Sequence, residues 1–226
     1  MTVARIATEG PGAEGVTRLR VSLQDVKPTA WRRIVVPGSI MLADLHIVVQ
    51  AAMGWDDHHL WCFHLHGVDY GPETGRNPRV PLSRFLLREG ERFSYVYDFG
   101  DWWKHDVRVE PVKPGDARGG VPRCVAGRGT CPPEGCGGPA GYADAVTEAL
   151  DPFADDFGMM ADFADELVDG HRTGDFRRLT DSDRLDDLDR TVGRVRRRLR
   201  LFEPFDKGAA NERIGGNLGT NEEHLP

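Results

Sequence analysis

The chain lacks a long apolar segment. None of its hydrophobic runs approaches the roughly 20 residues that an α-helix needs to span a bilayer. The first fifteen residues also contain no apolar stretch of the length found in signal peptides. We therefore expect a cytoplasmic protein with no membrane partner.

Cysteine is scarce, and positive charge is in the minority. Four cysteines in 226 residues, three of them in one loop, argue against a disulfide framework. The formal net charge of −7 opposes non-specific attraction to nucleic acid phosphates. We therefore expect a protein partner of unknown identity, and the net acidity disfavours nucleic acid without excluding it.

One basic segment stands out against this acidic background. Five arginines lie between Arg194 and Arg200, and they follow an acidic segment from Asp181 to Asp189. On a helix this pattern is typical of a solvated, salt-bridged face, and a phosphate-binding stripe is the second interpretation. The second interpretation would make the chain a nucleic-acid accessory protein.

The order of the expected elements predicts an α+β fold. Residues 19–23 and 31–36 have the pattern of a β-hairpin, and apolar residues at helical spacing follow over 42–53. Strands are predicted next at 60–68, 93–97 and 107–109, and projection back along the last strand places Trp103 and His105 on its inward face. We expect a mixed β-sheet packed on a helix, of β-grasp type. Additional C-terminal helices are expected at 142–150, 155–168 and 181–201.

The composition divides the chain into three parts. Residues 1–15 and 207–226 are polar, Gly-rich and aperiodic, so we predict a flexible N-terminal tail and a disordered C-terminal tail. Residues 16–206 are predicted to form a single domain. This domain includes a cysteine-containing loop at 122–142.

That loop reads PRCVAGRGTCPPEGCGGPAGY. A short loop rich in Gly and Pro buries too little apolar surface to hold a fixed shape alone, whereas thiolates on a tetrahedral zinc ion would hold it. We predict a structural zinc site made by Cys124, Cys131, Cys136 and the inward-facing His105. Buried or free thiols and redox-active thiols are the alternatives. The other candidates for the fourth ligand are Cys62, His64 and His66.

Carboxylates near this loop suggest a second kind of site. The turn at 98–101 and the cysteine loop could form the two sides of a cleft, with Glu134 as general base on a metal-bound water. The alternative is structural: the aspartates cap turn amides and Glu134 pairs with Arg32 or Arg33. We favour a non-enzymatic module, with a metal-dependent hydrolase as the alternative. The catalytic candidates are Asp98, Asp101 and Glu134, beside His105.

Several sequence blocks lie between about residues 17 and 170. They are Lys27-Pro28, Trp31-Arg32-Arg33, Leu45-His46, Gly54-Trp55, His59-Leu60 with Phe63, Tyr97–Asp101, Trp103, His105, Pro132–Glu134, Cys136–Gly138 and Gly141-Tyr142. Together these blocks resemble the family named after the third open reading frame of the plant-root-inducing plasmid pRi. Some of its members are labelled as resolvase-like or passenger proteins of mobile elements. The resemblance implies an α+β fold with no firmly established activity and an association with mobile elements. The chain has Gly135 and Trp61 where the family often has Asp and His.

Overall fold

The computed structural model describes residues 15–151 and 155–220, which form two compact units. The first unit contains the chain up to Pro139 and again from Pro204 onward, and the second contains Ala140–Glu203. The chain therefore leaves the first unit and later returns to it, where the sequence predicted one domain over 16–206. The predicted N-terminal tail lies outside the described residues apart from Gly15.

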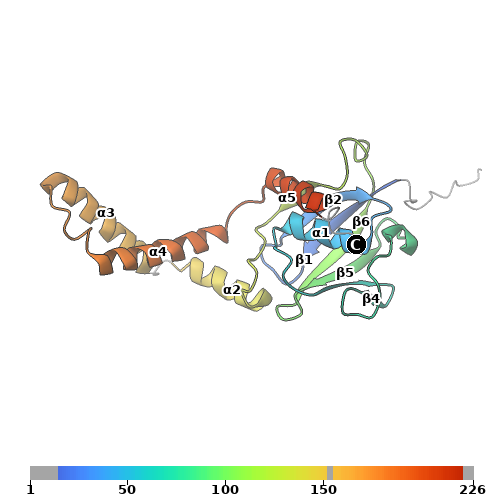
Figure 1. The fold of residues 1–226 in the computed structure, drawn as a ribbon, viewed down its shortest axis with the longest axis horizontal. Coiled ribbons are helices and arrows are strands. Elements are labelled where there is room, and N and C mark those ends of the chain that lie inside the picture. The colour runs from blue at the N-terminus through green and yellow to red at the C-terminus, as the bar shows by residue number, and fades with distance from the viewer. Residues whose placement is uncertain (1–14, 152–154, 221–226) are drawn as a thin grey trace, which may run out of the picture. The chain divides into compact units, whose positions relative to one another are not determined.

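The first unit is built on a seven-stranded sheet (Figure 1). Its strand order is β4-β3-β5-β6-β1-β2-β7, and every ladder between these strands is antiparallel. The α+β prediction is confirmed, whereas the sheet is antiparallel rather than mixed and the β-grasp detail is not confirmed. The strands are β1 (Val16–Leu23), β2 (Trp31–Pro37), β3 (Trp61–Leu65), β4 (Val68–Tyr70), β5 (Arg92–Tyr97), β6 (Trp103–Glu110) and β7 (Arg123–Arg128).

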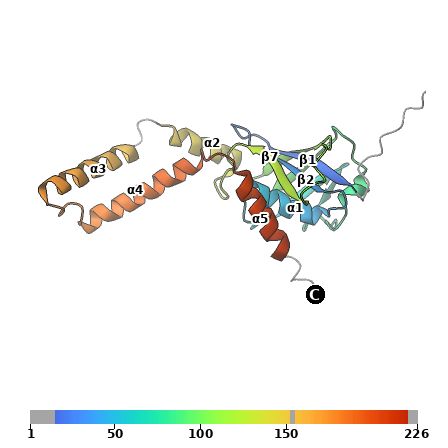
Figure 2. The ribbon, with the colours of Figure 1, turned by 90° about the horizontal axis from the view of Figure 1, so that it is seen from above.

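One face of this sheet forms the core. The inward residues of the strands alternate with outward polar residues, as a half-buried sheet requires. Helix α1 (Leu42–Met53) and helix α5 (Lys207–Thr220) pack against each other on the core side (Figure 2). A short 3₁₀ helix, η1 (Leu82–Phe85), lies between β4 and β5 in the chain.

Helix α5 replaces most of the disordered tail predicted from residue 207. Ala210 and Ile214 lie four residues apart and are both buried, so the helix has an apolar stripe that its Gly-rich composition obscured. The Arg213 side chain donates to the carbonyl of Ala51 in α1 at 2.8 Å. This contact places a cation at the carboxyl end of α1, where it favours the helix dipole.

The second unit is helical. Helix α2 (Gly138–Ala149) starts at the boundary, and α3 (Asp155–Thr173) lies beside α4 (Ser182–Arg200). The basic segment of α4 is salt-bridged: Arg194 pairs with Asp156 at 2.8 Å, and Arg198 pairs with Glu148 at 3.2 Å. None of the helices within the described ranges has the length and apolar character that a membrane span requires.

Candidate functional site

The three cysteines of the loop do not converge on a shared point. Cys124 lies in β7 and is buried in the core, whereas Cys131 and Cys136 are partly exposed in the loop that follows. Within residues 15–151 and 155–220, no three His, Cys, Asp or Glu side chains are arranged to hold a metal ion. The zinc site predicted at Cys124, Cys131, Cys136 and His105 thus finds no support in the structure.

The thiols behave as buried groups. Burial raises the pKa of Cys131 to about 12 and also raises the pKa values of Cys124 and Cys136. A protonated thiol is a poor nucleophile, so these side chains have the character of packing residues near neutral pH.

Hydrogen bonds to other residues hold the cysteine loop in place. The indole nitrogen of Trp55 donates to the carbonyl of Pro132 at 2.8 Å. The Glu134 carboxylate accepts from the backbone N–H of Asp56 at 2.9 Å and from the hydroxyl of Tyr97. Burial, followed by the bond to Glu134, raises the pKa of Tyr97. The loop therefore takes its shape from the sheet end and the 55–56 segment.

Two of the three predicted catalytic carboxylates, those of Asp98 and Glu134, have separate structural partners, whereas the buried Oδ2 of Asp101 has no hydrogen-bond partner among the described residues. Asp98 accepts from the backbone N–H groups of Gly100 and Asp101, which is the turn-capping role that the sequence suggested. Glu134 bonds Tyr97 rather than an arginine, which corrects the predicted pairing with Arg32 or Arg33. His105 is fully buried on β6.

Arg32 and Arg33 lie on opposite faces of β2. Arg32 points into the core, where its guanidinium donates to backbone carbonyls that include Ala52 at 2.9 Å. Arg33 points the other way and forms a bidentate ion pair with Glu110 on β6. The second face of the sheet therefore carries its own polar groups.

This second face, which we call the open face, consists of the outward side chains of β1, β2, β5 and β6. Strand alternation places polar residues on it because the apolar partners fill the core. Cations outnumber carboxylates there, although the chain as a whole is acidic. The charged members are Arg18, Arg20, Arg33, Arg92, Lys104, Asp106, Arg108 and Glu110.

Four of these arginines form a row across the sheet. Arg20 on β1 is directly opposite Arg33 on β2 and also opposite Arg108 on β6. Arg108 is in turn opposite Arg92 on β5. Neighbouring strands lie about 4.8 Å apart, so this arginine row extends roughly 15 Å across four strands.

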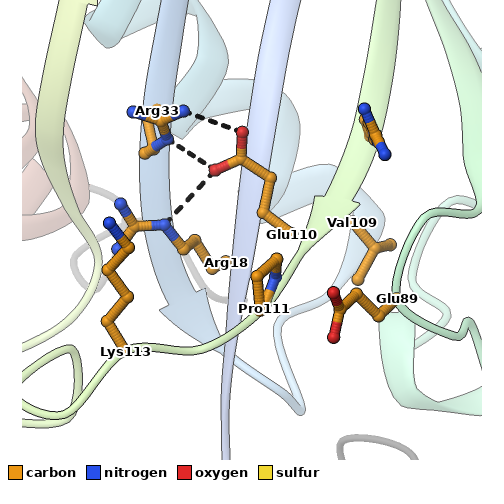
Figure 3. A pocket seen from close by; sticks show the side chains of 8 residues that line it. Arg18, Arg33, Glu89, Val109, Glu110, Pro111 and Lys113 are labelled. Atoms are coloured by element: carbon orange, nitrogen blue, oxygen red, sulfur yellow. Dashed lines mark hydrogen bonds and ion pairs between the residues drawn. The ribbon is translucent and has the colours of Figure 1, made fainter.

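A pocket of about 260 Å³ adjoins the row at Arg33 and Arg108. Figure 3 shows the guanidinium groups of Arg18 and Arg33 directed at the same carboxylate, that of Glu110. The hydrogen bonds from Arg33, then its charge, hold the pKa of Glu110 below its usual value. The other lining residues are Glu89, Val109, Pro111 and Lys113.

Trp31 stands beside the row on the same face. The guanidinium carbon of Arg20 lies 4.5 Å from the centroid of its ring, and that of Arg33 lies 5.1 Å from it. The indole is partly exposed. Cation–π attraction therefore orients two members of the arginine row around an aromatic group.

A family model described as "Plasmid pRiA4b ORF-3-like protein" matches residues 15–175. The match covers more than half of the chain, with all seven strands of the sheet and helices α1, α2 and α3. The chain belongs to the plasmid pRiA4b ORF-3-like family. The family resemblance seen in the sequence is thereby confirmed.

Two proteins similar to this member of the pRiA4b ORF-3-like family are themselves described without a function. "Uncharacterized protein y4hQ" of Sinorhizobium fredii (strain NBRC 101917 / NGR234) is 41% identical over 145 residues, which is 61% of this chain and 74% of that protein. A crystal structure of the protein of unknown function MM3350 from Methanosarcina mazei Go1 has a TM-score of 0.57 and 32% identity. It covers 63% of this chain and 85% of its own chain. These likenesses support the fold and the family.

Sequence reasoning missed the open face of this pRiA4b ORF-3-like protein. The signal was present within each strand, because Arg18 and Arg20 alternate with apolar residues in TRLRVSL. The cross-strand register that aligns Arg20 with Arg33 and Arg108 joins residues up to 88 positions apart. A single sequence does not give that register.

Proposed function

We propose that the protein is a non-enzymatic binding module whose open face recognises an anionic partner. The observation that carries this proposal is the arginine row of Arg33, Arg20, Arg108 and Arg92. Like charges directly opposite each other on neighbouring strands destabilise a sheet. An anionic ligand bound to this face would offset that repulsion. The relief of repulsion would contribute to the free energy of binding.

The carboxylates of the face compensate only part of its charge. Glu110 is shared by Arg33 and Arg18, Arg18 also pairs with Asp116 at 2.7 Å, and Asp106 pairs with Arg92 at 3.0 Å. Within the described residues, Arg20 and Arg108 have no carboxylate partner. Two neighbouring guanidinium groups at the centre of the row are therefore available to a ligand.

We propose a cytoplasmic location and an association with mobile genetic elements. All four cysteines are free thiols, which suits a reducing compartment. The family description names a plasmid open reading frame, which supports the link to mobile elements. An anionic partner at this location would be a cellular polyanion.

Binding of a labelled, abasic single-stranded phosphodiester oligomer, followed by fluorescence anisotropy, tests the proposal. The intact chain is expected to bind with an affinity that falls as salt rises, because cations released from the phosphates drive association. Replacing Arg20→Gln together with Arg108→Gln should weaken binding about tenfold or more. The salt slope should fall by about 1.4, at about 0.7 per lost contact.

The matched control is Arg196→Gln together with Arg197→Gln in α4. It changes the net charge equally, and both arginines are exposed and belong to the second unit. We expect this variant to bind as the original chain does. Equal weakening of both variants, or no binding by the intact chain, would contradict the proposal.

A further inference from the structure

We infer that the anionic partner of the open face is single-stranded nucleic acid, with its phosphates on the arginine row and a base on Trp31. This inference rests on the proposed function and specifies its ligand. Three observations carry it: the aromatic group beside the row, the width of the row, and the pocket that continues it.

The aromatic group distinguishes nucleic acid from other polyanions. Surfaces that bind single strands combine cations along the backbone with aromatic side chains on which bases stack. Trp31 is partly exposed and lies against Arg20 and Arg33. An acidic peptide would use the arginines alone, whereas a nucleotide uses the cations and the indole together.

The shape of the face favours a single strand over a duplex. The major groove of B-DNA admits a helix or a two-stranded ribbon, being about 12 Å wide. The arginine row crosses four strands and roughly 15 Å, so its members cannot all enter such a groove. A sheet face with cations on four adjacent strands suits a single strand whose bases are splayed onto it.

The pocket extends the cationic track past the row. Arg33 and Arg108 line it and also belong to the row, and Lys113 adds a further exposed cation. Its volume of about 260 Å³ is small beside most ligand pockets, which suits one sugar-phosphate unit of a longer strand. The carboxylate of Glu110 inside the pocket is already paired with Arg18 and Arg33.

The test compares four labelled probes on the full chain. These are a mixed-sequence single-stranded oligonucleotide, the abasic oligomer of equal length, a duplex of equal length, and oligoglutamate. The oligonucleotide is expected to bind at least fivefold more tightly than the abasic oligomer, because stacking on one aromatic side chain contributes roughly 5- to 150-fold in affinity. It should also quench tryptophan fluorescence.

Two substitutions of Trp31 separate stacking from folding. Trp31→Ala should reduce oligonucleotide affinity to that of the abasic oligomer. Trp31→Phe keeps an aromatic ring, so it should retain most of the affinity and lose most of the quenching. Thermal melting of both variants checks that the sheet is intact, and the Phe variant stays informative where the Ala variant fails to fold.

Each outcome has a separate meaning. Equal affinity for the oligonucleotide and the abasic oligomer, unchanged by Trp31→Ala, would overturn the inference and leave the proposed function standing. Tighter binding of the duplex or of oligoglutamate would also overturn it. Failure of all four probes to bind would defeat the proposed function itself.

Discussion

Arg108 carries the least compensated charge of the arginine row. It is exposed, it lies between Arg20 and Arg92 in register, and its side chain has no ion pair or hydrogen bond in the part of the chain that the structure describes. Like-charged neighbours on adjacent strands cost stability. Residues that lower the stability of the fold are expected at binding surfaces. The uncompensated charge of Arg108 fits this expectation.

Removing this charge should stabilise the protein while weakening its binding of anions. Arg108→Gln is expected to raise the free energy of unfolding by about 0.5 kcal/mol, because repulsion from two arginines is lost. Urea denaturation measures this change, and Arg196→Gln is the control that should leave stability within error. A destabilised Arg108→Gln variant would show that the row is held by attractions and is not under repulsion.

His105 is a titratable group inside the aromatic core. Its ring lies 5.4 Å from that of Trp55 and 5.2 Å from that of Tyr95, measured between centroids. Its Nε2 atom has no hydrogen-bond partner among the described residues. Burial lowers the pKa of His105 from 6.5 to about 4, so the imidazole stays neutral in the folded protein over most of the physiological range.

Stability should therefore fall in mild acid. Below about pH 6.5 the unfolded chain binds a proton at His105, whereas the folded chain does so only near pH 4. Unfolding is thus favoured as the pH drops through this interval, by about 2–3 kcal/mol in total. Burial also lowers the pKa of His46, which adds a loss of the same sign.

Melting temperatures measured between pH 7 and pH 4 check this expectation. A His105→Phe variant, which keeps a ring and cannot titrate, should show a shallower decline than the original protein. His171→Gln, which removes an exposed imidazole of the second unit, is the matched control for loss of a histidine. Parallel profiles for the original chain and His105→Phe would mean that His105 titrates alike in both states.

Helix α5 protects one margin of the sheet. Strand β7 is the last strand in the order, so its outer backbone groups have no neighbouring strand. The amide of Asn211 meets this need, because it accepts from the N–H of Cys124 at 2.7 Å and donates to its carbonyl at 3.0 Å. Covering an edge strand in this way guards against pairing with another chain.

Loss of the apolar anchor of α5 should weaken the first unit. Ile214 is 2% exposed, and Ile214→Ala is expected to lower the free energy of unfolding by about 2–4 kcal/mol. Gly216→Ala is the control in the same helix, since a Cβ there meets no atom within 4 Å. It should stabilise the helix by about 0.5–1 kcal/mol. Denaturant midpoints compare the two, and an unchanged Ile214→Ala midpoint would mean that α5 is not part of the cooperative unit.

The net charge of the chain is negative, whereas cations predominate on its open face. A net charge of −7 led the sequence analysis to disfavour nucleic acid, yet the open face collects cations from four strands. Net charge sums over the chain, whereas a ligand responds to the groups nearest it, because salt screens charges beyond about 10 Å. The distribution of charge, rather than its total, therefore decides which partners suit this protein.

The sequence predicted individual strands and helices better than their arrangement in space. The alternation in β1 and β3 and the helical spacing from Leu42 to Met53 were sufficient for those elements and for the inward orientation of His105. Helix α5 was missed because its glycines resemble a loop, and its stability comes from packing on α1. Cysteine spacing suggested convergence on a metal ion, whereas Cys124 is a buried residue of β7 and no group of three possible ligands is found among the described residues.

The first unit is made from two stretches of chain, with Ala140–Glu203 inserted between them. Its integrity therefore does not depend on an unbroken backbone through the insertion. After a protease cuts the chain within the inserted helices, packing and hydrogen bonds alone would hold α5 against α1. The N-terminal and C-terminal fragments should therefore migrate together in native electrophoresis and separate only after denaturation. The same property makes the insertion a suitable place to divide the gene into two co-expressed halves that reassemble.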